Sequence, residues 1–269
     1  MIYRVFPPPV RLAPYVRFFW ALEGNVGRGE EFVHRTVADG SVEMVFHYRG
    51  AFSELSAEGE TSASTRGNIQ AQSTVYRRFV GRESFGIFGV YLFPFAIPKL
   101  FSMPASELTD ISPDLRDVFG VEAALLEEKI ALAKDSEERV GIAIRFLLGK
   151  LDSSTWDILP IHHAVRKVMD AKGDVDISSI SRDFSLSRRQ FERRFKEVAG
   201  LSPKLYSRVI RFQAATQFKV SGFTDLASIA YECGYYDQSH FTNDFRRFSG
   251  YTPKQYFLGS AEGTQYLDV

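Results

Sequence analysis

Residues 176–206 read DISSISRDFSLSRRQFERRFKEVAGLSPKLY, and residues 225–256 read DLASIAYECGYYDQSHFTNDFRRFSGYTPKQY. The two stretches match at an offset of 49 residues before their central turn and of 50 residues after it. One residue has therefore been added in the turn, where a loop tolerates an insertion. Each stretch predicts a short helix, a tight turn and a second helix, so the chain carries a duplicated two-helix unit.

The second helix of each copy has clear limits in the sequence. In the first copy, Ser187 suits the N-cap position, and Gln190 completes a capping box three residues later. Gly200 ends this helix, because glycine adopts the left-handed conformation that follows a last helical turn. In the second copy, Asp237 and Gly250 take the same two places.

Each second helix also has an apolar face and a polar face, because its apolar residues recur four and then three positions apart. The apolar faces carry Phe191, Phe195 and Val198 in the first copy, and Phe241, Phe245 and Phe248 in the second. The polar faces carry Arg188, Arg189, Glu192, Arg193 and Lys196 in the first copy, and Gln238, Ser239, His240, Thr242, Asn243, Arg246 and Arg247 in the second.

A short helix, a tight turn and a second helix with a polar face are typical of a helix-turn-helix motif. The second helix fits the major groove, where side chains can distinguish all four base pairs. Arginine and lysine also neutralise phosphates. We therefore expect the twelve polar-face residues to contact double-stranded DNA; the alternative is that they form ordinary solvent-exposed surfaces.

The segment between the two copies predicts one continuous helix. Ser202 suits its N-cap, Pro203 suits its first position, and neither glycine nor a further proline occurs up to Lys219. Seventeen residues in a helix span roughly 25 Å. With the width of the flanking units, such a helix could hold two reading helices in successive major grooves, about 34 Å apart.

The second copy resembles the signature of the AraC/XylS family of transcription regulators. The resemblance extends over residues 160–258. The matching residues are Ile229-Ala230, Cys233-Gly234-Tyr235, Asp237-Gln238-Ser239-His240-Phe241, Phe245-Arg246-Arg247 and Gly250-Tyr251-Thr252-Pro253. It implies two helix-turn-helix motifs that are joined by one helix and bind DNA as a unit. We expect a cytoplasmic regulator of the activator type, although the sequence leaves activation and repression open.

By position, the resemblance places the usual base contacts of the family on Arg189, Glu192, Arg193, Ser239 and Asn243. Asn243 stands where an arginine is frequent, which predicts a weaker contribution of the second helix to phosphate or guanine binding. A second departure lies in the first turn.

Ser185 occupies the place in the first turn where the family often has a glycine. That turn has to form without one.

The formal charge of the 269-residue chain is zero, but it is unevenly distributed. Residues 160–258 carry 16 Lys and Arg against 10 Asp and Glu, whereas residues 1–159 carry 17 against 21. The chain thus joins a basic part to an acidic part, and the overall neutrality hides the charge expected of a nucleic-acid-binding domain.

The chain contains a single cysteine, Cys233, which excludes an intrachain disulfide and fits a reducing cytoplasm. We expect Cys233 to pack as a small apolar residue in the second turn. The N-terminus has no basic region followed by an apolar run, so no secretion signal is expected. The apolar run of residues 85–98 is too short to span a membrane and predicts a buried strand.

The first hundred residues predict short strands that form a small antiparallel barrel or sandwich. Residues 1–12, with three consecutive prolines, are expected to form an extended arm, and residues 53–66 a loop. Asp39-Gly40 signals a turn between two of the strands. The expected strands are residues 15–22, 32–37, 42–48, 69–80 and 84–93.

The residues after Pro104 predict helices. Short helices start near residues 106–108 and 113–115, and longer ones cover about 121–133 and 135–150. The expected organisation is therefore an α+β N-terminal domain followed by an all-α DNA-binding domain with two helix-turn-helix motifs and a linker helix. The domain limits are 1–151 for the effector-sensing or dimerisation domain, 152–160 for a linker, 161–258 for the DNA-binding domain and 259–269 for a tail.

Three segments, Val16–Trp20, Asp39–Glu43 and Gly89–Pro94, resemble an N-terminal domain that is attached to some AraC-type regulators. In the family generally, this domain senses an effector or mediates dimerisation. The resemblance names no ligand and no effector-binding residue. The aromatic residues of this part either line an effector pocket or fill the core: Phe18, Phe19, Trp20, Phe46, Tyr48, Tyr91, Phe93 and Phe95.

Four N-terminal residues, His34, Asp39, Glu43 and His47, could in principle bind a divalent metal, since Glu43 and His47 share one face of a strand. Scattered histidines and acids on strands are more often held by local hydrogen bonds. We therefore expect no metal and no cofactor. We also expect no catalytic residue, because no nucleophile and base are suitably spaced.

The sequence leads to a transcription regulator that binds a specific DNA site and whose N-terminal domain senses a signal or dimerises. Its expected partners are promoter or operator DNA, RNA polymerase, a small-molecule effector and a second copy of the chain, with no membrane. One alternative is a DNA-binding regulator with a ligand-free protein-interaction module. Another is a bifunctional protein with an N-terminal cupin-like metalloenzyme.

Overall fold

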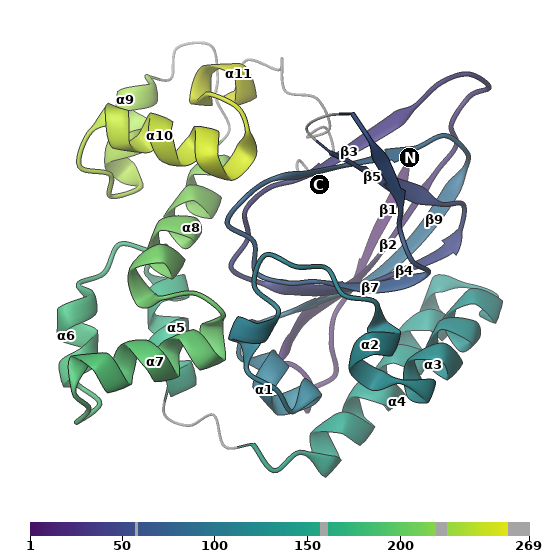
Figure 1. Ribbon diagram of the computed structural model, residues 1–269, viewed down its shortest axis with the longest axis horizontal. Helices are drawn as coiled ribbons and strands as arrows, with labels where there is room; N and C mark the ends of the chain where they lie inside the picture. The colour runs from purple at the N-terminus through teal and green to yellow at the C-terminus, as the bar shows by residue number, and fades with distance from the viewer. Residues whose placement is uncertain (57–58, 157–160, 219–224, 258–269) are drawn as a thin grey trace.

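The computed structural model describes residues 1–56, 59–156, 161–218 and 225–257. A β-rich N-terminal part lies on one side of the molecule, and a helical C-terminal part lies on the other (Figure 1). This arrangement confirms the expected fold class. Residues 157–160 of the expected linker and the expected tail 259–269 lie outside the described residues.

Two antiparallel sheets form the N-terminal part. The five-stranded sheet has the order β1 (Ile2–Phe6), β2 (Val16–Gly24), β9 (Phe85–Leu92), β4 (Val42–Arg49) and β7 (Gly67–Gln70). The four-stranded sheet has the order β3 (Phe32–Thr36), β8 (Arg77–Gly81), β5 (Phe52–Leu55) and β6 (Thr61–Ala63). The expected barrel or sandwich is therefore a sandwich of two sheets.

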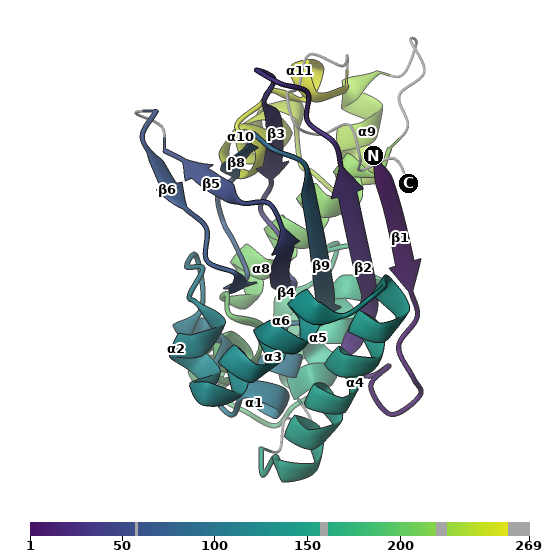
Figure 2. The ribbon, with the colours of Figure 1, turned by 90° about the vertical axis from the view of Figure 1, so that its right-hand side faces the viewer.

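One face of the five-stranded sheet is covered by helices (Figure 2). Alternate residues such as Met44, Phe46 and Phe88 point to this face and are buried with apolar residues of the helices. The helical elements are α1 (Ala96–Phe101), the 3₁₀ helix η1 (Ala105–Glu107), α2 (Leu115–Phe119), α3 (Val121–Leu132) and α4 (Ser136–Ser153). This contact forms the main N-terminal core.

The other face of the five-stranded sheet, here called the inner face, is turned toward the four-stranded sheet. A smaller apolar cluster joins the two sheets, with Val45 and Ile87 from the first and Phe52 and Phe79 from the second. This cluster occupies only part of the inner face. Residues farther along the same strands, including Glu43, are half-buried.

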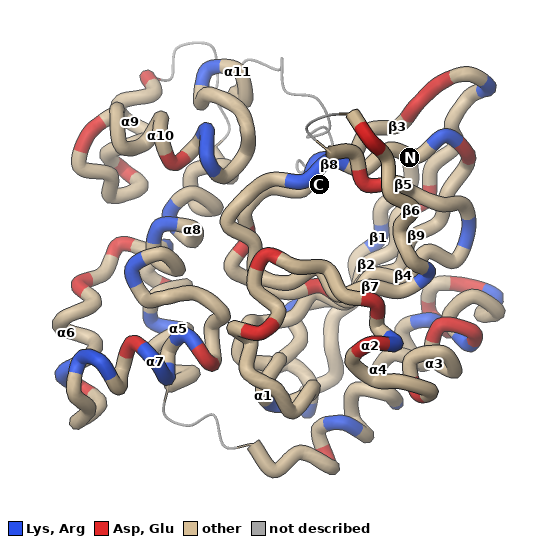
Figure 3. Tube along the Cα trace, viewed as in Figure 1, with Lys and Arg blue, Asp and Glu red and all other residues tan. Residues whose placement is uncertain are grey.

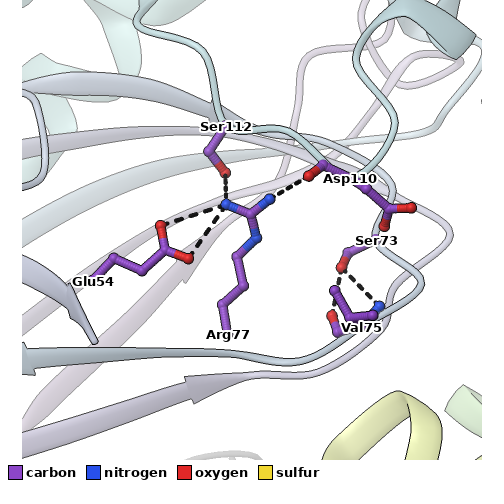
Figure 4. A network of polar contacts seen from close by, with 6 residues as sticks. All are labelled: Glu54, Ser73, Val75, Arg77, Asp110 and Ser112. Atoms are coloured by element: carbon purple, nitrogen blue, oxygen red, sulfur yellow. Dashed lines mark hydrogen bonds and ion pairs between the residues drawn. The ribbon is translucent and has the colours of Figure 1, made fainter. Parts of the chain in front are cut away.

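Arg77 holds the four-stranded sheet to the segment that precedes α2 (Figure 4). Its Nη1 donates to Ser112 Oγ at 3.2 Å and lies 3.5 Å from Glu54 Oε2, and its Nη2 donates to the carbonyl oxygen of Asp110. The same segment bonds to the loop before β8, because Asp110 Oδ1 accepts from the Thr74 backbone N–H at 2.6 Å. These bonds fix the edge of the sandwich.

Four sequence predictions for the N-terminal part were wrong in detail. Residues 1–12 do not form only an extended arm, because β1 pairs with β2 over Ile2–Phe6. The expected loop 53–66 contains most of β5 and all of β6, which pair through backbone groups despite their polar side chains. The expected strand 69–80 is divided between the two sheets, and helix α1 was not foreseen.

The Asp39-Gly40 turn also differs from a hairpin turn. The strands on its two sides, β3 and β4, belong to different sheets, so this turn carries the chain from one layer of the sandwich to the other. Asp39 Oδ1 accepts from the Ser41 backbone N–H at 2.9 Å, which stabilises the turn locally.

The C-terminal part consists of helices around a core of aromatic side chains. The helices are α5 (Ile161–Asp170), α6 (Ile177–Arg182), α7 (Arg188–Ala199), α8 (Pro203–Thr216), α9 (Leu226–Glu232), α10 (Gln238–Ser249) and α11 (Pro253–Phe257). The predicted apolar faces are buried, including Phe191 and Phe195 of α7 and Phe241 and Phe245 of α10. Cys233 is buried as expected.

Helix α8 links the two helix-turn-helix units and packs against both α7 and α10. It begins at Pro203 as predicted, but it ends at Thr216 rather than continuing to Lys219, which lies outside the described residues. Its 14 residues span about 21 Å. Ser202 occupies the N-cap position, but its side chain caps no backbone N–H that the structure describes.

Within the described ranges, no helix is both long enough and apolar enough to cross a membrane.

Candidate nucleic-acid interface

Helices α7 and α10 present their polar faces to solvent. Figure 3 shows lysine and arginine along both helices. Of the twelve predicted contact residues, Glu192, His240 and Thr242 are half-buried. The exposed ones are Arg188, Arg189, Arg193, Lys196, Gln238, Ser239, Asn243, Arg246 and Arg247. Neither face is buried against the N-terminal part, so both are open to a partner.

Side-chain caps define the start of α7 and of α10. Ser187 and Gln190 form the predicted capping box, with both the side chain of Ser187 and that of Gln190 engaged. Asp237 accepts from the His240 backbone N–H at 2.7 Å. An aspartate also caps the preceding helix of each unit, since Asp176 and Asp225 accept from backbone N–H groups two residues later. The predicted caps at Ser187 and Asp237 are confirmed.

Two ion pairs lie along the exposed face of α7. Arg188 Nε is 3.0 Å from Glu192 Oε1, and Arg193 Nε is 3.9 Å from Glu197 Oε1. Exposed pairs at this spacing contribute only about 0.3–0.5 kcal/mol. The arginines can therefore exchange these partners for phosphates or bases at little cost.

The buried carboxylate of Asp244 was missed in the sequence. It lies on α10 with its side chain 1% exposed and forms a two-armed ion pair with Arg208 of α8, in which Arg208 Nε is 3.2 Å from Asp244 Oδ2. The hydrogen bond from Arg208 to Asp244 raises the pKa of the guanidinium. This pair fixes the second reading helix to the linker helix. The position of this acid, between Phe241 and Phe245 of the apolar face, was the sequence signal that could have predicted a buried carboxylate.

The two turns of the helix-turn-helix motifs have the same backbone conformation at equivalent positions. Ser185 in the first turn has φ of 51°, and Gly234 in the second has φ of 71°. This left-handed region suits glycine and strains a residue with a Cβ by roughly 1–2 kcal/mol. The first turn therefore forms without the glycine, as the sequence requires, at the expense of local strain.

Replacing Ser185 with glycine should raise the free energy of unfolding by about 0.5–1 kcal/mol, because the relief of strain exceeds the entropy that glycine adds to the unfolded chain. Urea unfolding followed by circular dichroism would measure the change. Ser187→Gly is the control, because it removes the side chain that caps α7 and should not raise the free energy of unfolding. A destabilised Ser185→Gly variant would show that the turn is unstrained.

The N-terminal part contacts the same corner of both helix-turn-helix units. Thr109 Oγ1 donates to the carbonyl oxygen of Gly200 at 2.8 Å, directly after α7. Arg35 Nη1 donates to the carbonyl oxygen of Ser249 at 3.1 Å, where α10 ends. Gly200 and Gly250 are equivalent in the duplication. The N-terminal part therefore contacts each helix-turn-helix unit at the same place, the C-terminal end of its second helix.

Further contacts strengthen the second of these two docking points. The Arg35 guanidinium lies over the rings of Tyr76 and Tyr251, 4.6 Å and 4.2 Å from their centroids. The Ala38 backbone N–H donates to the carbonyl oxygen of Phe248 at 2.8 Å. The Ala38 carbonyl oxygen accepts from Gln213 Nε2 of α8. The turn after β3 is thus bonded to both α8 and α10.

The structure brings part of the candidate metal set together. Glu43 and His47 lie on the same face of β4, and His34 faces them from β3 closely enough that His47 contributes to its lowered pKa. Burial is the main cause that lowers the pKa of His34 and of His47 to about 4. However, the described residues contain no group of three or more His, Cys, Asp and Glu that could hold a metal ion.

Two family models match the chain. Residues 180–258 match a helix-turn-helix domain, and residues 4–114 match a domain of unknown function (DUF6597). Together with two capped reading helices on one linker helix, the first match defines the C-terminal part as a helix-turn-helix domain of the DNA-binding class. The C-terminal part is thus similar to the helix-turn-helix domains of AraC-type regulators.

The curated relatives match only within the C-terminal part. The HTH-type transcriptional activator RhaS of Escherichia coli strain SE11 is 32% identical over 81 residues, which are 30% of this chain and 29% of RhaS. RhaS of strain K12 / DH10B gives the same figures. The match therefore spans less than a third of these relatives.

Solved structures with a similar chain path were also found. ToxT from Vibrio cholerae O395 is 11% identical with a TM-score of 0.47, and the match covers 89% of this chain and 97% of ToxT. The C-terminal domain of AraT from Geobacillus stearothermophilus is 23% identical with a TM-score of 0.35, covering 39% of this chain and 88% of that domain.

Proposed function

We propose that this protein is a sequence-specific DNA-binding transcription regulator of the activator type. The observation that carries the proposal is the pair of exposed, arginine-rich and amide-rich faces on α7 and α10, held on one linker helix. Arginine and amide side chains on such helices read base edges in the major groove, while the remaining cations bind phosphates. The relatives named as activators support the same function.

Arg193→Ala tests the proposed base contacts. Arg193 is exposed on α7 and held only by a 3.9 Å pair with Glu197, so its loss should cost about 1–3 kcal/mol of specific binding and little stability. The measurement is an electrophoretic mobility shift with promoter DNA selected by the wild-type protein, compared with scrambled DNA.

Lys204→Ala is a matched control, because Lys204 is an exposed cation outside the reading faces. It should weaken binding to selected and scrambled DNA equally, or not at all. If Arg193→Ala leaves both the affinity and the base preference unchanged, Arg193 does not read a base.

We propose residues 1–151 as the sensing or dimerising domain, 152–160 as the linker, 161–258 as the DNA-binding domain and 259–269 as the tail. Helix α4 extends to Ser153, so the linker would begin within its last turn. We propose RNA polymerase and a small-molecule effector as further partners, and the cytoplasm as the compartment in which the protein meets them.

Dimerisation through α3 is favoured by a specific observation. Val121, Leu125 and Leu132 are exposed along this helix and lie on one face, in an apolar stripe that the exposed Glu128 interrupts. Exposed apolar stripes of this kind commonly mark protein interaction sites. The stripe also fits the alternative in which the N-terminal part binds another protein instead of a small molecule.

Leu125→Glu should convert a dimer into a monomer, because it replaces an apolar residue of the stripe with a second charge beside Glu128. Sedimentation equilibrium of the wild-type and variant proteins would measure the difference. Val10→Glu, which changes an exposed apolar residue outside α3, should leave the association unchanged. A monomeric wild-type protein would exclude the proposed dimer. Against the third function, a cupin-like metalloenzyme, stands the finding that the described residues contain no group of three or more possible metal ligands.

A further inference from the structure

The inner face of the five-stranded sheet carries a half-buried row of side chains beyond its apolar cluster. The register places Gln70, Glu43, Tyr91 and Phe18 side by side on β7, β4, β9 and β2. Phe18 and Tyr91 stack with their ring centroids 4.9 Å apart. All four residues are half-buried, so this row remains partly accessible between the two sheets.

Two carboxyl groups meet at this row, and the Arg17 guanidinium lies over the Tyr91 ring, 5.6 Å from its centroid. Glu43 lies close enough to Asp39 that Asp39 adds to the effect of burial and raises the pKa of Glu43 to about 8. Asp39 accepts hydrogen bonds from the Tyr91 hydroxyl and the Ser41 backbone N–H. Neither carboxylate forms an ion pair with a residue that the structure describes.

The same surface contains a buried acceptor without a partner. Asn68 is 7% exposed, and its Oδ1 has no hydrogen-bond partner among the described residues. Asn68 pairs with Val45 across the sheet, so it points to the inner face as a diagonal neighbour of Glu43. A buried amide oxygen without a donor destabilises the folded protein, and a donating ligand would satisfy it.

Aromatic rings border these acceptors. Trp20 lies against Gly89 so closely that a Cβ there would be 2.1 Å from the indole, which leaves the indole flat on the inner face. Tyr3 stacks obliquely against Trp20 at 6.3 Å, and its pKa is raised to about 12 by burial and then by Glu43. Aromatic faces beside carboxylates are the surroundings that bind organic cations.

We propose that the inner face around Glu43 binds a small organic cation, an amine attached to an apolar or aromatic body. The ammonium N–H groups would bond to the oxygens of Glu43, Asp39 and Asn68, and the body would lie on Trp20 and Phe18. An anion would meet two acids, and a metal ion would find too few ligands. The inference deepens the proposed function, since it names the class of signal that the N-terminal part senses.

This site is joined to the DNA-binding part by a single turn. Gly40, next to Asp39, packs so closely on α8 that a Cβ there would lie 2.8 Å from atoms of Tyr206 and Ile210. Ala38, on the other side of Asp39, bonds to α8 and α10. A cation that draws Asp39 toward itself therefore acts on the turn that holds both helices.

Three probes of the same shape test the charge preference: phenethylamine, 2-phenylethanol and phenylacetate. Titration calorimetry of the full chain at about pH 9, above the pKa of Glu43, should give the order amine, alcohol, acid. Glu43→Gln should weaken binding of the amine about tenfold or more and leave that of the alcohol unchanged. Glu31→Gln, an exposed acid outside this face, should change neither.

An acid that binds as tightly as the amine, an amine affinity that Glu43→Gln does not change, or no binding at millimolar concentrations would each overturn the proposal. Thermal unfolding of the variant ensures that it is folded. The titration needs no DNA, and a mobility shift without probe needs no ligand. If the amine does not bind but the mobility shift persists, the ligand proposal fails and the DNA-binding function stands. If the amine binds but no mobility shift is seen, the DNA-binding function fails and the ligand site stands.

Discussion

Replacing Arg208 with alanine is expected to lower the free energy of unfolding by about 3–5 kcal/mol and to abolish specific DNA binding. The reason is that the change leaves the carboxylate of Asp244, 1% exposed, without its partner in the core between α8 and α10. His240, 3.6 Å away, cannot replace a two-armed guanidinium. The second reading helix would then lose its fixed orientation on the linker helix.

Removal of Asp244 should be less costly than removal of Arg208. The Arg208 side chain is 29% exposed and can turn toward water, whereas Asp244 cannot. The double variant should be less unstable than the sum of the single variants, because the pair acts as a unit. Urea unfolding of the three variants measures this coupling, with the exposed Arg246→Ala as a control. Additive losses would show that the two charges do not stabilise each other.

Replacing Glu43 with glutamine is expected to stabilise the protein, and increasingly so as the pH rises. Burial and Asp39 raise the pKa of Glu43 from 4.5 to about 8 in the folded state. Between these values, the unfolded state has lost this proton while the folded state retains it. The contribution of Glu43 to stability therefore falls as the pH rises from 4.5 to 8, by several kcal/mol in total, and no further above 8.

Urea unfolding of both proteins at about pH 5 and pH 9 measures this difference. The other titrating groups on this face are Asp39, Tyr91, Tyr3, His34 and His47, and only the Glu43 carboxyl is lost in the variant. Comparison at equal pH removes the other contributions. A stability difference that is the same at both pH values, or a variant that is less stable at pH 9, would contradict the raised pKa.

The histidines give the opposite slope at acid pH. The pKa values of His34 and His47 are lowered to about 4, so the unfolded state binds protons below pH 6.5 that the folded state does not. The contribution of the two histidines to stability therefore falls as the pH drops from 6.5 to 4, in the wild-type and Glu43→Gln proteins alike, so it cancels when the two proteins are compared at equal pH.

The sequence predicts the parts of the fold that depend on neighbouring residues. Ser187 and Gln190 specify a helix start within four residues, and the spacing of Phe241 and Phe245 specifies a buried face within two turns. The duplication predicted that the second unit has the same helices and turn as the first. These signals lie within a few residues of each other, so they can be recognised without knowledge of the tertiary structure.

The contacts that join distant segments were not predictable in the same way. Nothing near Thr109 indicates that it bonds to Gly200, and nothing near Asp244 names Arg208 as its partner. Likewise, residues 69–80 read as one strand because no glycine or proline divides them, yet the chain passes there between two sheets. The assignment of DNA contacts remains a prediction from residue type and exposure.

The docking of both helix-turn-helix units on one body limits how the protein can accommodate its operator. Thr109 and Arg35 are attached to the same sandwich, so the two units cannot swing apart about α8 while both bonds persist. One base pair inserted between two half-sites turns one of them by about a tenth of a helical turn. Two helix-turn-helix units held in fixed relative positions should bind operators with such altered spacing more weakly. Two units free to move about α8 would bind them with little loss of affinity.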